Sequence, residues 1–299
     1  MRQRLGRIHL LESLARRMSG ILYVVATPIG NLEDMTLRAL RILRSVAVIA
    51  AEDTRRTARL LQHYSISSPT TSLHEHNERT KSATLVARLL AGDSVALVSD
   101  AGTPLISDPG RHFVAAARAA GIRIDGIPGP SAIVTALSIS GLEAAEFTFL
   151  GFPPIRSTDR FLWMARAVAE PRLVVFFEAP HRIRRTLQDL GQASSLERTI
   201  AIGRELSKAH EEMVIRPISE ILAASESPKG EYTILLPPYD LVKQPIIIPE
   251  AAALINEFCH LIDNMAVNRR AAMKILADKY GMSVNDVYRA LVSSRKSVE

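Results

Sequence analysis

Residues 95–132 read VALVSDAGTPLISDPGRHFVAAARAAGIRIDGIPGPSA, and this pattern predicts one complete strand–helix–strand unit. The first four residues form a short apolar run that is typical of a fully buried strand. A loop rich in Gly, Pro, Ser and Asp follows, and Asp108 and Pro109 suit the cap and the first position of the next helix. A second strand over 122–127 ends in another small-residue loop, Pro128–Ala132. Loops after neighbouring parallel strands border a ligand crevice, so the two loops together indicate a binding site.

The same alternation precedes this unit. Apolar runs over 21–26, 46–51 and 70–73 predict three more strands, with helical spacing between them. Strands separated by helices predict a doubly wound α/β domain with a parallel sheet, which would bring the polar residues that follow each strand to one rim. Neither small-residue loop contains a glycine-rich phosphate-binding motif.

The second half of the chain has more strand patterns and fewer helical ones. Its expected strands cover residues 147–150, 172–177, 199–202, 211–215 and 232–236. This pattern predicts a second α/β domain with a mixed, partly antiparallel sheet. A proline-studded linker and a wholly helical tail follow. The expected domains are an N-terminal extension at 1–19, a first α/β domain at 20–130, a second at 131–240, and a small helical domain at 250–299.

The length and composition are those of a globular protein that is large enough for two domains. The chain has 299 residues, of which 47% are apolar and 23% charged. Its single cysteine, Cys259, excludes an internal disulfide, is expected in the core, and suits a reducing cytosol. No apolar run reaches membrane-spanning length and residues 1–19 lack a secretory pattern, so a cytoplasmic protein without a membrane partner is expected. His74 and His76 lack metal-ligand spacing, and no metal site is expected.

The net charge of +6 is concentrated at the two ends of the chain. Residues 1–19 and 267–299 each carry +4, whereas the body carries −2. Basic ends favour a polyanion partner, and a generic solvated surface is the alternative. Ala277, Gly281 and Val287 have the spacing of a helix–turn–helix in the basic tail, although a small bundle without a nucleic-acid role would show the same spacing.

Several ordered motifs support a family resemblance that runs from about residue 20 to the end. They are Thr-Pro-Ile-Gly-Asn-Leu at 27–32, Ala-Glu-Asp-Thr-Arg at 51–55, Ser-Asp-Ala-Gly-Thr-Pro at 99–104, Pro-Gly-Pro-Ser-Ala at 128–132, Glu-Ala-Pro-His-Arg at 178–182, Gly-Arg-Glu-Leu-Ser-Lys at 203–208 and Gly-Glu at 230–231. Together they resemble the tetrapyrrole methylase superfamily and, within it, the branch that methylates small-subunit ribosomal RNA.

The resemblance implies a two-domain fold that binds S-adenosylmethionine between its domains, and a homodimer. It also implies methyl transfer to the 2′-hydroxyl of a cytidine in the decoding region of 16S ribosomal RNA. The positions that it assigns to the cofactor are Pro28, Asp100, Ala101, Gly102, Thr103, Ile106, Ser131, Ala132, Phe177, Glu178, Arg204 and Gly230. Tetrapyrrole-specific relatives have an acidic residue where this chain has Thr103, which favours the RNA branch.

A ribose hydroxyl is a poor nucleophile, so a base would assist its methylation. Carboxylates at strand ends are the candidates, namely Glu52, Glu205 and Glu231, and each could instead be a cap or half of an ion pair. Arginines suit phosphate contacts, and the candidates are Arg55, Arg56, Arg111, Arg182, Arg269 and Arg270, each of which could instead be a solvated side chain.

Two other functions fit parts of the pattern. An enzyme of the same fold could methylate a tetrapyrrole or a diphthine precursor. A non-enzymatic protein could bind nucleic acid through the tail at 266–295, and such a protein would bind no cofactor and tolerate changes in the Gly102 and Ser131 loops.

Overall fold

The structure is a computed structural model, and it describes residues 19–224, 230–238, 251–263, 267–280 and 283–293. Nearly all of the expected N-terminal extension and the helix–turn–helix position Gly281 lie outside these ranges. The described residues form two compact units. The first contains the chain up to Gly141 and a later segment, Ile202–Val214; the second contains Leu142–Ala201 and the chain from Ile215 onward.

The first unit is built on a five-stranded sheet. Its strands are β1 (Ile21–Val25), β2 (Val48–Ala51), β3 (Thr70–Ser72), β4 (Val95–Val98) and β5 (Arg123–Ile127), in the order β3-β2-β4-β1-β5. All neighbouring pairs are parallel, which confirms the expected parallel sheet. The carboxyl ends of all five strands therefore lie at one edge of the sheet.

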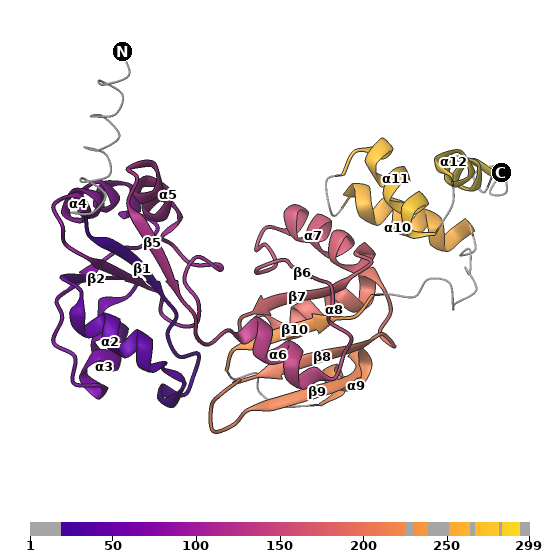
Figure 1. Cartoon of the computed structure of the whole chain (residues 1–299). Helices are drawn as coiled ribbons and strands as arrows, with labels where there is room; N and C mark the ends of the chain where they lie inside the picture. Colours follow the sequence, from indigo (N-terminus) through magenta and orange to yellow (C-terminus); the bar gives the residue numbers. More distant parts are fainter. Residues whose placement is uncertain (1–18, 225–229, 239–250, 264–266, 281–282, 294–299) are drawn as a thin grey trace, which may run out of the picture. The chain divides into compact units, whose positions relative to one another are not determined.

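Helices cover both faces of this sheet (Figure 1). They are α2 (Leu37–Ser45) and α3 (Thr54–His63) on one face, and α4 (Glu78–Leu90) and α5 (Arg111–Ala119) on the other; a short 3-10 helix, η1 (Leu32–Asp34), precedes α2, and α6 (Ala132–Ser140) follows β5. The central strands β2 and β4 are buried along their whole length, which explains their uninterrupted apolar sequences.

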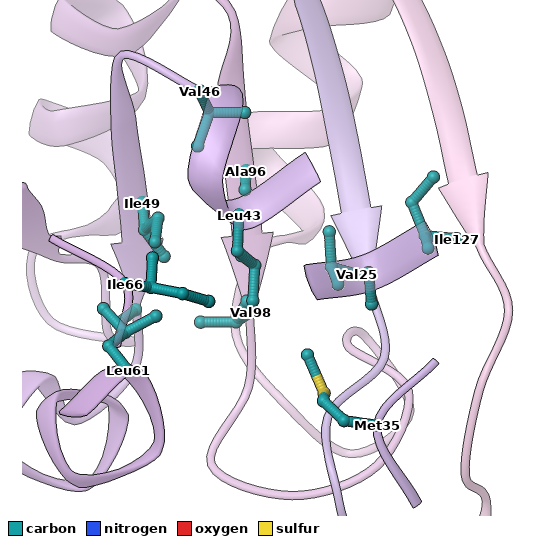
Figure 2. Packing of buried hydrophobic residues seen from close by; sticks show 12 residues of the cluster. Val25, Met35, Leu43, Val46, Ile49, Leu61, Ile66, Ala96, Val98 and Ile127 are labelled. Atoms are coloured by element: carbon teal, nitrogen blue, oxygen red, sulfur yellow. The ribbon is translucent and has the colours of Figure 1, made fainter. Parts of the chain in front are cut away.

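Figure 2 shows the core on the α2–α3 face. Leu43 of α2 and Leu61 of α3 pack against Ile49 and Val98 of the sheet, and Met35 closes the cluster next to Val25 and Ile127. On the opposite face Phe113 of α5 and Leu89 of α4 are fully buried. These two cores fix the strand ends, and thereby the loops that follow them.

The second sheet is mixed, as expected. Its strands are β6 (Phe147–Phe149), β7 (Leu173–Glu178), β8 (Thr199–Arg204), β9 (Glu212–Pro217) and β10 (Tyr232–Leu236), in the order β6-β7-β10-β8-β9. β6 runs parallel to β7, whereas β10 runs antiparallel to β7. The helices in this part of the chain are α7 (Ser157–Ala169), α8 (Ile183–Ala193) and α9 (Ile218–Ala223).

The tail is helical in the part that the structure describes. It contains α10 (Ala251–Asp263), α11 (Arg269–Lys279) and α12 (Val284–Ser293) around a small core that includes Ala277 and Val287. Cys259 is exposed, so its expected place in the core was wrong. The buried stripe of α10 runs through Leu254 and Leu261, and Cys259 lies off that stripe. Within the described ranges, no helix is both long and apolar enough to cross a membrane.

Candidate active site

The loops after β1 and β4 are joined at the carboxyl edge of the first sheet. Thr27 and Gly102 exchange backbone hydrogen bonds of 2.9 and 3.0 Å, and the Thr27 hydroxyl donates to the Ser99 carbonyl at 3.2 Å. Gly102 has a φ of +78°, which favours glycine because side chains crowd the backbone there. These bonds hold the Ala101–Thr103 turn in place and leave Ala101 and Thr103 exposed.

Asp100 connects this turn to the loop after β2. Its Oδ1 accepts the Asp53 N–H at 3.0 Å, and its Oδ2 lies 3.2 Å from Nη1 of Arg56. Its own N–H donates to Oε2 of Glu52 at 3.4 Å. The structure therefore brings together three residues that the sequence predicted for different roles, namely Glu52, Arg56 and Asp100.

The carboxylates of this edge have different proton affinities. Burial raises the pKa of Glu52, and the charge of nearby Asp100 raises it further. Asp53 is the opposite case, because hydrogen bonds from Arg55 lower its pKa to about 2. Asp53 also caps α3 by accepting the Arg55 N–H at 2.9 Å. Glu52 is therefore the better proton acceptor of these two neighbours, whereas Asp53 is held in an ion pair.

The first turn of α5 is capped by a residue from α4. Oε1 of the buried Glu78 accepts the N–H groups of Gly110, His112 and Phe113 at 3.1, 2.6 and 3.3 Å. The expected cap, Asp108, was wrong: α5 begins at Arg111 after Gly110, whose φ is +119°. This φ favours glycine, and the carboxylate comes from a residue 32 positions earlier in the chain.

Asp108 instead lies half-buried beside the other carboxylates. Burial raises its pKa to about 6, with further contributions from Glu52 and Asp100, whereas a hydrogen bond with Ser99 acts in the opposite direction. Its ionised form is therefore less stable in the folded protein than in water. Between its ordinary pKa and pH 6 the unfolded chain loses this proton while the folded chain keeps it, so rising pH destabilises the fold across that window.

Replacing Asp108 with asparagine is therefore expected to stabilise the protein at pH 8. A shift of about two pKa units corresponds to about 3 kcal/mol, and solvent screening of a half-buried group reduces the expected gain to about 1 kcal/mol. Urea unfolding of wild type and Asp108→Asn at pH 8 and at pH 4 measures it. At pH 4, close to the ordinary carboxyl pKa of 3.8, Asp108 is protonated in the folded chain and only partly ionised in the unfolded chain, so most of the gain should be lost. An equal gain at both pH values contradicts the electrostatic cause.

A cavity of about 170 Å³ opens beside α3 at the same edge. We call it the α3 cavity, and the residues that line it are Thr27, Pro28, Leu32, Arg56, Thr57, Arg59, Leu60, Ser99 and Asp100. Three of them, Pro28, Arg56 and Asp100, were candidate site residues from the sequence. Arg59 was not, although it stands one helical turn after Arg56.

Arg204 is the last residue of β8, and Glu205 begins a loop that packs, within the first unit, against the loop after β1. Glu205 has a φ of +50°, and its Oε1 accepts from Lys208 Nζ at 2.8 Å. Nε of Arg204 lies 3.3 Å from a carboxylate oxygen of Glu212. The hydroxyl of Ser207 donates to Asp34, and a Cβ on Gly30 would lie only 2.3 Å from Cγ of Lys208. A non-glycine residue in a left-handed conformation is typical of a constrained functional loop.

In the second unit, Glu178 is 2% exposed and both of its oxygens are engaged. Oε1 accepts the Ala179 N–H at 2.9 Å and lies 3.3 Å from Nε of Arg182, whereas Oε2 accepts from the Thr186 hydroxyl and lies 3.9 Å from Nη1 of Arg160. Arg182 also donates to the carbonyl of Pro153. The Glu178 side chain is therefore committed to a buried network, which leaves its backbone for the predicted cofactor contact.

The remaining sequence candidates fall into three groups. Ile106 is 43% exposed, Ser131 and Ala132 are half-buried at the start of α6, and Thr103 donates to the Pro130 carbonyl at 3.3 Å. In the second unit, Phe177 is half-buried against the rings of Phe149 and Phe152, Gly230 has a φ of +88°, and Glu231 is exposed. Of the predicted RNA contacts, Arg55, Arg56, Arg111, Arg269 and Arg270 are exposed, and Arg182 lies in the buried network.

No three His, Cys, Asp or Glu side chains gather as a metal site in the portion that the structure describes. The polar groups of the described site come from backbone turns, carboxylates and arginines. Such a set can hold a positively charged ligand, accept a proton and contact phosphates.

Comparison with known proteins gives concordant sequence and fold relatives. The family profile described as Tetrapyrrole (Corrin/Porphyrin) Methylases matches residues 21–222. A Pseudomonas aeruginosa protein named ribosomal RNA small subunit methyltransferase I is 42% identical over 268 residues, which cover 83% of this chain and 95% of the relative. An Escherichia coli O157:H7 protein of the same name is 39% identical over 279 residues, which cover 92% of this chain and 96% of the relative.

Solved structures with low sequence identity share the fold. A diphthine synthase matches with a TM-score of 0.60 at 14% identity, covering 74% of this chain and 90% of that structure. A uroporphyrin-III-C-methyltransferase from Thermus thermophilus matches with a TM-score of 0.51 at 20% identity, covering 73% of this chain and 94% of that structure. The two α/β sheets and the helical tail agree with the expected fold. The chain therefore belongs to the tetrapyrrole methylase family and, within it, to the group of relatives named ribosomal RNA small subunit methyltransferase I.

Proposed function

We propose that this protein uses S-adenosylmethionine to methylate the 2′-hydroxyl of a cytidine in the decoding region of 16S ribosomal RNA. The observation that carries the proposal is the 42% identity to a relative named ribosomal RNA small subunit methyltransferase I over 95% of that relative's length. Homodimeric assembly and a cytoplasmic location are part of the same proposal, and so are the expected domain boundaries.

The carboxyl edge of the first sheet fits this cofactor chemically. In many α/β folds the helix after such a loop binds a phosphate with its free N–H groups. Here the Glu78 carboxylate occupies that position at α5, so a phosphate-bearing cofactor would meet a like charge. S-adenosylmethionine carries a sulfonium and no phosphate, and Glu52, Asp100 and Asp108 around the turn favour a positive charge.

The cofactor, when bound, supplies a methyl group that the sulfonium makes electrophilic. This chain contributes position and proton transfer. The turn over Ala101–Thr103 is fixed by the Thr27–Gly102 hydrogen bonds, and a fixed turn can hold a donor in line with an acceptor hydroxyl. Glu52, with its raised pKa, is the first candidate to take the hydroxyl proton, and Glu205 and Glu231 are the others.

The proposed RNA contacts are the exposed arginines of α3, α5 and α11. Arg55 and Arg56 lie at the same edge as Glu52, Arg111 begins α5, and Arg269 and Arg270 begin α11. Arginine suits this role because its guanidinium binds two phosphate oxygens at once. Arg182 is paired with Glu178, so only the accessible part of its side chain is a candidate for RNA contact.

The test is methyl transfer from radiolabelled S-adenosylmethionine to small ribosomal subunits and to free 16S ribosomal RNA. We expect label in RNA, mapped to a 2′-O-methylated cytidine of the decoding region. At saturating cofactor, Glu52→Gln should lower the rate at least tenfold, because glutamine cannot accept the hydroxyl proton. Glu220→Gln, an exposed change on α9, should leave the rate unchanged. Cofactor binding without labelling of either RNA sample would refute the RNA assignment and favour a tetrapyrrole or diphthine-type substrate.

A further inference from the structure

The α3 cavity has room for part of a ligand rather than for a whole cofactor. Its volume of about 170 Å³ lies below the roughly 300–1,000 Å³ of sites that enclose drug-sized molecules. It is also several times the roughly 30 Å³ that one water molecule occupies in the liquid. A sugar or a single charged group is of the appropriate size.

The charges that line the cavity add up to one excess positive charge. Arg56 is paired with Asp100 across 3.2 Å. Arg59, one turn further along α3, is exposed and forms no ion pair with any residue that the structure describes. A phosphodiester carries one negative charge, and the planar guanidinium of arginine matches two of its oxygens.

The rest of the lining suits the carbon face of a sugar. Pro28, Leu32 and Leu60 supply apolar surface. The Thr27 hydroxyl, although it lines the cavity, is already satisfied by the Ser99 carbonyl. With Arg56 paired to Asp100, the charge of the lining that no ion pair among the described residues offsets is that of Arg59, which favours a ligand with one anionic end and one weakly polar face.

We infer that the α3 cavity binds the sugar-phosphate of a substrate RNA nucleotide, with Arg59 as the contact to the phosphodiester. This inference rests on the proposed function. Asp100 belongs both to the cavity lining and to the loop that carries the Ala101–Thr103 turn, so a nucleotide seated here lies next to the proposed methyl-donor site. Arg59 thereby becomes a binding residue that orients the substrate.

The test compares Arg59→Gln with Arg118→Gln, which removes the same charge from an exposed position on α5, across the sheet. Isolated small ribosomal subunits serve as the substrate, and cofactor affinity is measured separately by calorimetry. We expect Arg59→Gln to raise KM for the subunits about tenfold and to leave kcat and cofactor Kd within twofold of wild type. The slope of log Kd for the subunits against log salt should fall by about 0.7, the value of one phosphate contact on a single strand.

Other outcomes separate the alternatives. Equal KM and equal salt slopes for Arg59→Gln and Arg118→Gln would overturn the inference while wild-type methylation of the subunits upholds the proposed function. If Arg59→Gln raised the cofactor Kd, the anionic group that Arg59 binds would be the carboxylate of the cofactor rather than an RNA phosphate, and the inference would be overturned. A wild-type protein that neither binds nor methylates the subunits would refute the proposed function together with the inference.

Discussion

Replacing Glu178 with alanine is expected to lower the free energy of unfolding of the second unit by about 4 kcal/mol. The carboxylate is buried, and its removal leaves Arg160, which is 3% exposed, without one of its two carboxylate neighbours. It also leaves the Thr186 hydroxyl and the Ala179 N–H without their acceptor. Breaking one partner of a buried ionic network costs about 3–5 kcal/mol because the remaining charge stays buried.

Trp163 provides a local probe for this measurement. It is the single tryptophan of the chain, and its ring packs against Phe176 of β7 at a centroid distance of 5.1 Å. Urea unfolding followed by its fluorescence therefore reports on the second unit. Glu197→Ala, an exposed change in the same unit, should cost less than about 0.5 kcal/mol. If Glu178→Ala cost no more than Glu197→Ala, the network would contribute nothing measurable to stability.

The second large effect concerns Glu78. Alanine at this position should destabilise the first unit by about 3 kcal/mol, because three N–H groups at the start of α5 lose their shared acceptor. Two of these donors belong to the buried residues Gly110 and Phe113 and cannot donate to water instead. A carboxylate at this end also interacts favourably with the helix dipole, and alanine removes that interaction.

Hydrogen exchange measured by mass spectrometry locates this effect. Peptides that cover 110–113 should exchange much faster in Glu78→Ala than in wild type, and Glu78→Gln, which keeps an acceptor oxygen, should lose only about 1 kcal/mol. Glu75→Ala is the matched control, since Glu75 is exposed three residues earlier. Unchanged exchange at the start of α5 in Glu78→Ala would show that water or another group replaces the carboxylate.

Much of the fold follows from local sequence pattern. The apolar runs at 95–98 and 232–236 are strands with the expected bounds, since β4 and β10 are buried throughout and nothing interrupts their pattern. The parallel direction of the first sheet follows from strand–helix alternation, whereas the order of its strands was not predicted. The helix α8 was missed, although its buried residues Ile183, Leu187 and Leu190 have the i, i+4, i+7 spacing of a helix with one buried face.

Only part of the candidate site could be predicted from the sequence. Motif positions led to Asp100, Gly102 and Glu52, which the structure places at one edge of the first sheet. The cap of α5 was missed because its acceptor, Glu78, is supplied by another helix, and no local spacing reports such a contact. The raised pKa of Asp108 was missed for the same reason, since it depends on burial and on charges from other loops. Arg59 carried only a weak signal, its spacing from Arg56.

The segment Ile202–Val214 belongs to the first unit but is made long after the rest of it, which has a consequence for synthesis on the ribosome. All five strands of the first sheet have been made once residue 127 is complete, whereas Ser207, which bonds Asp34 after β1, follows about 80 residues later. At about 5–20 residues per second this interval is roughly 4–16 s. The nascent chain therefore passes through a stage in which its sheet can form while the loop at 30–34 still lacks its cover. During that interval the unfinished loop is open to chaperones and proteases, and a ribosome that stalls within the second unit would prolong this exposure.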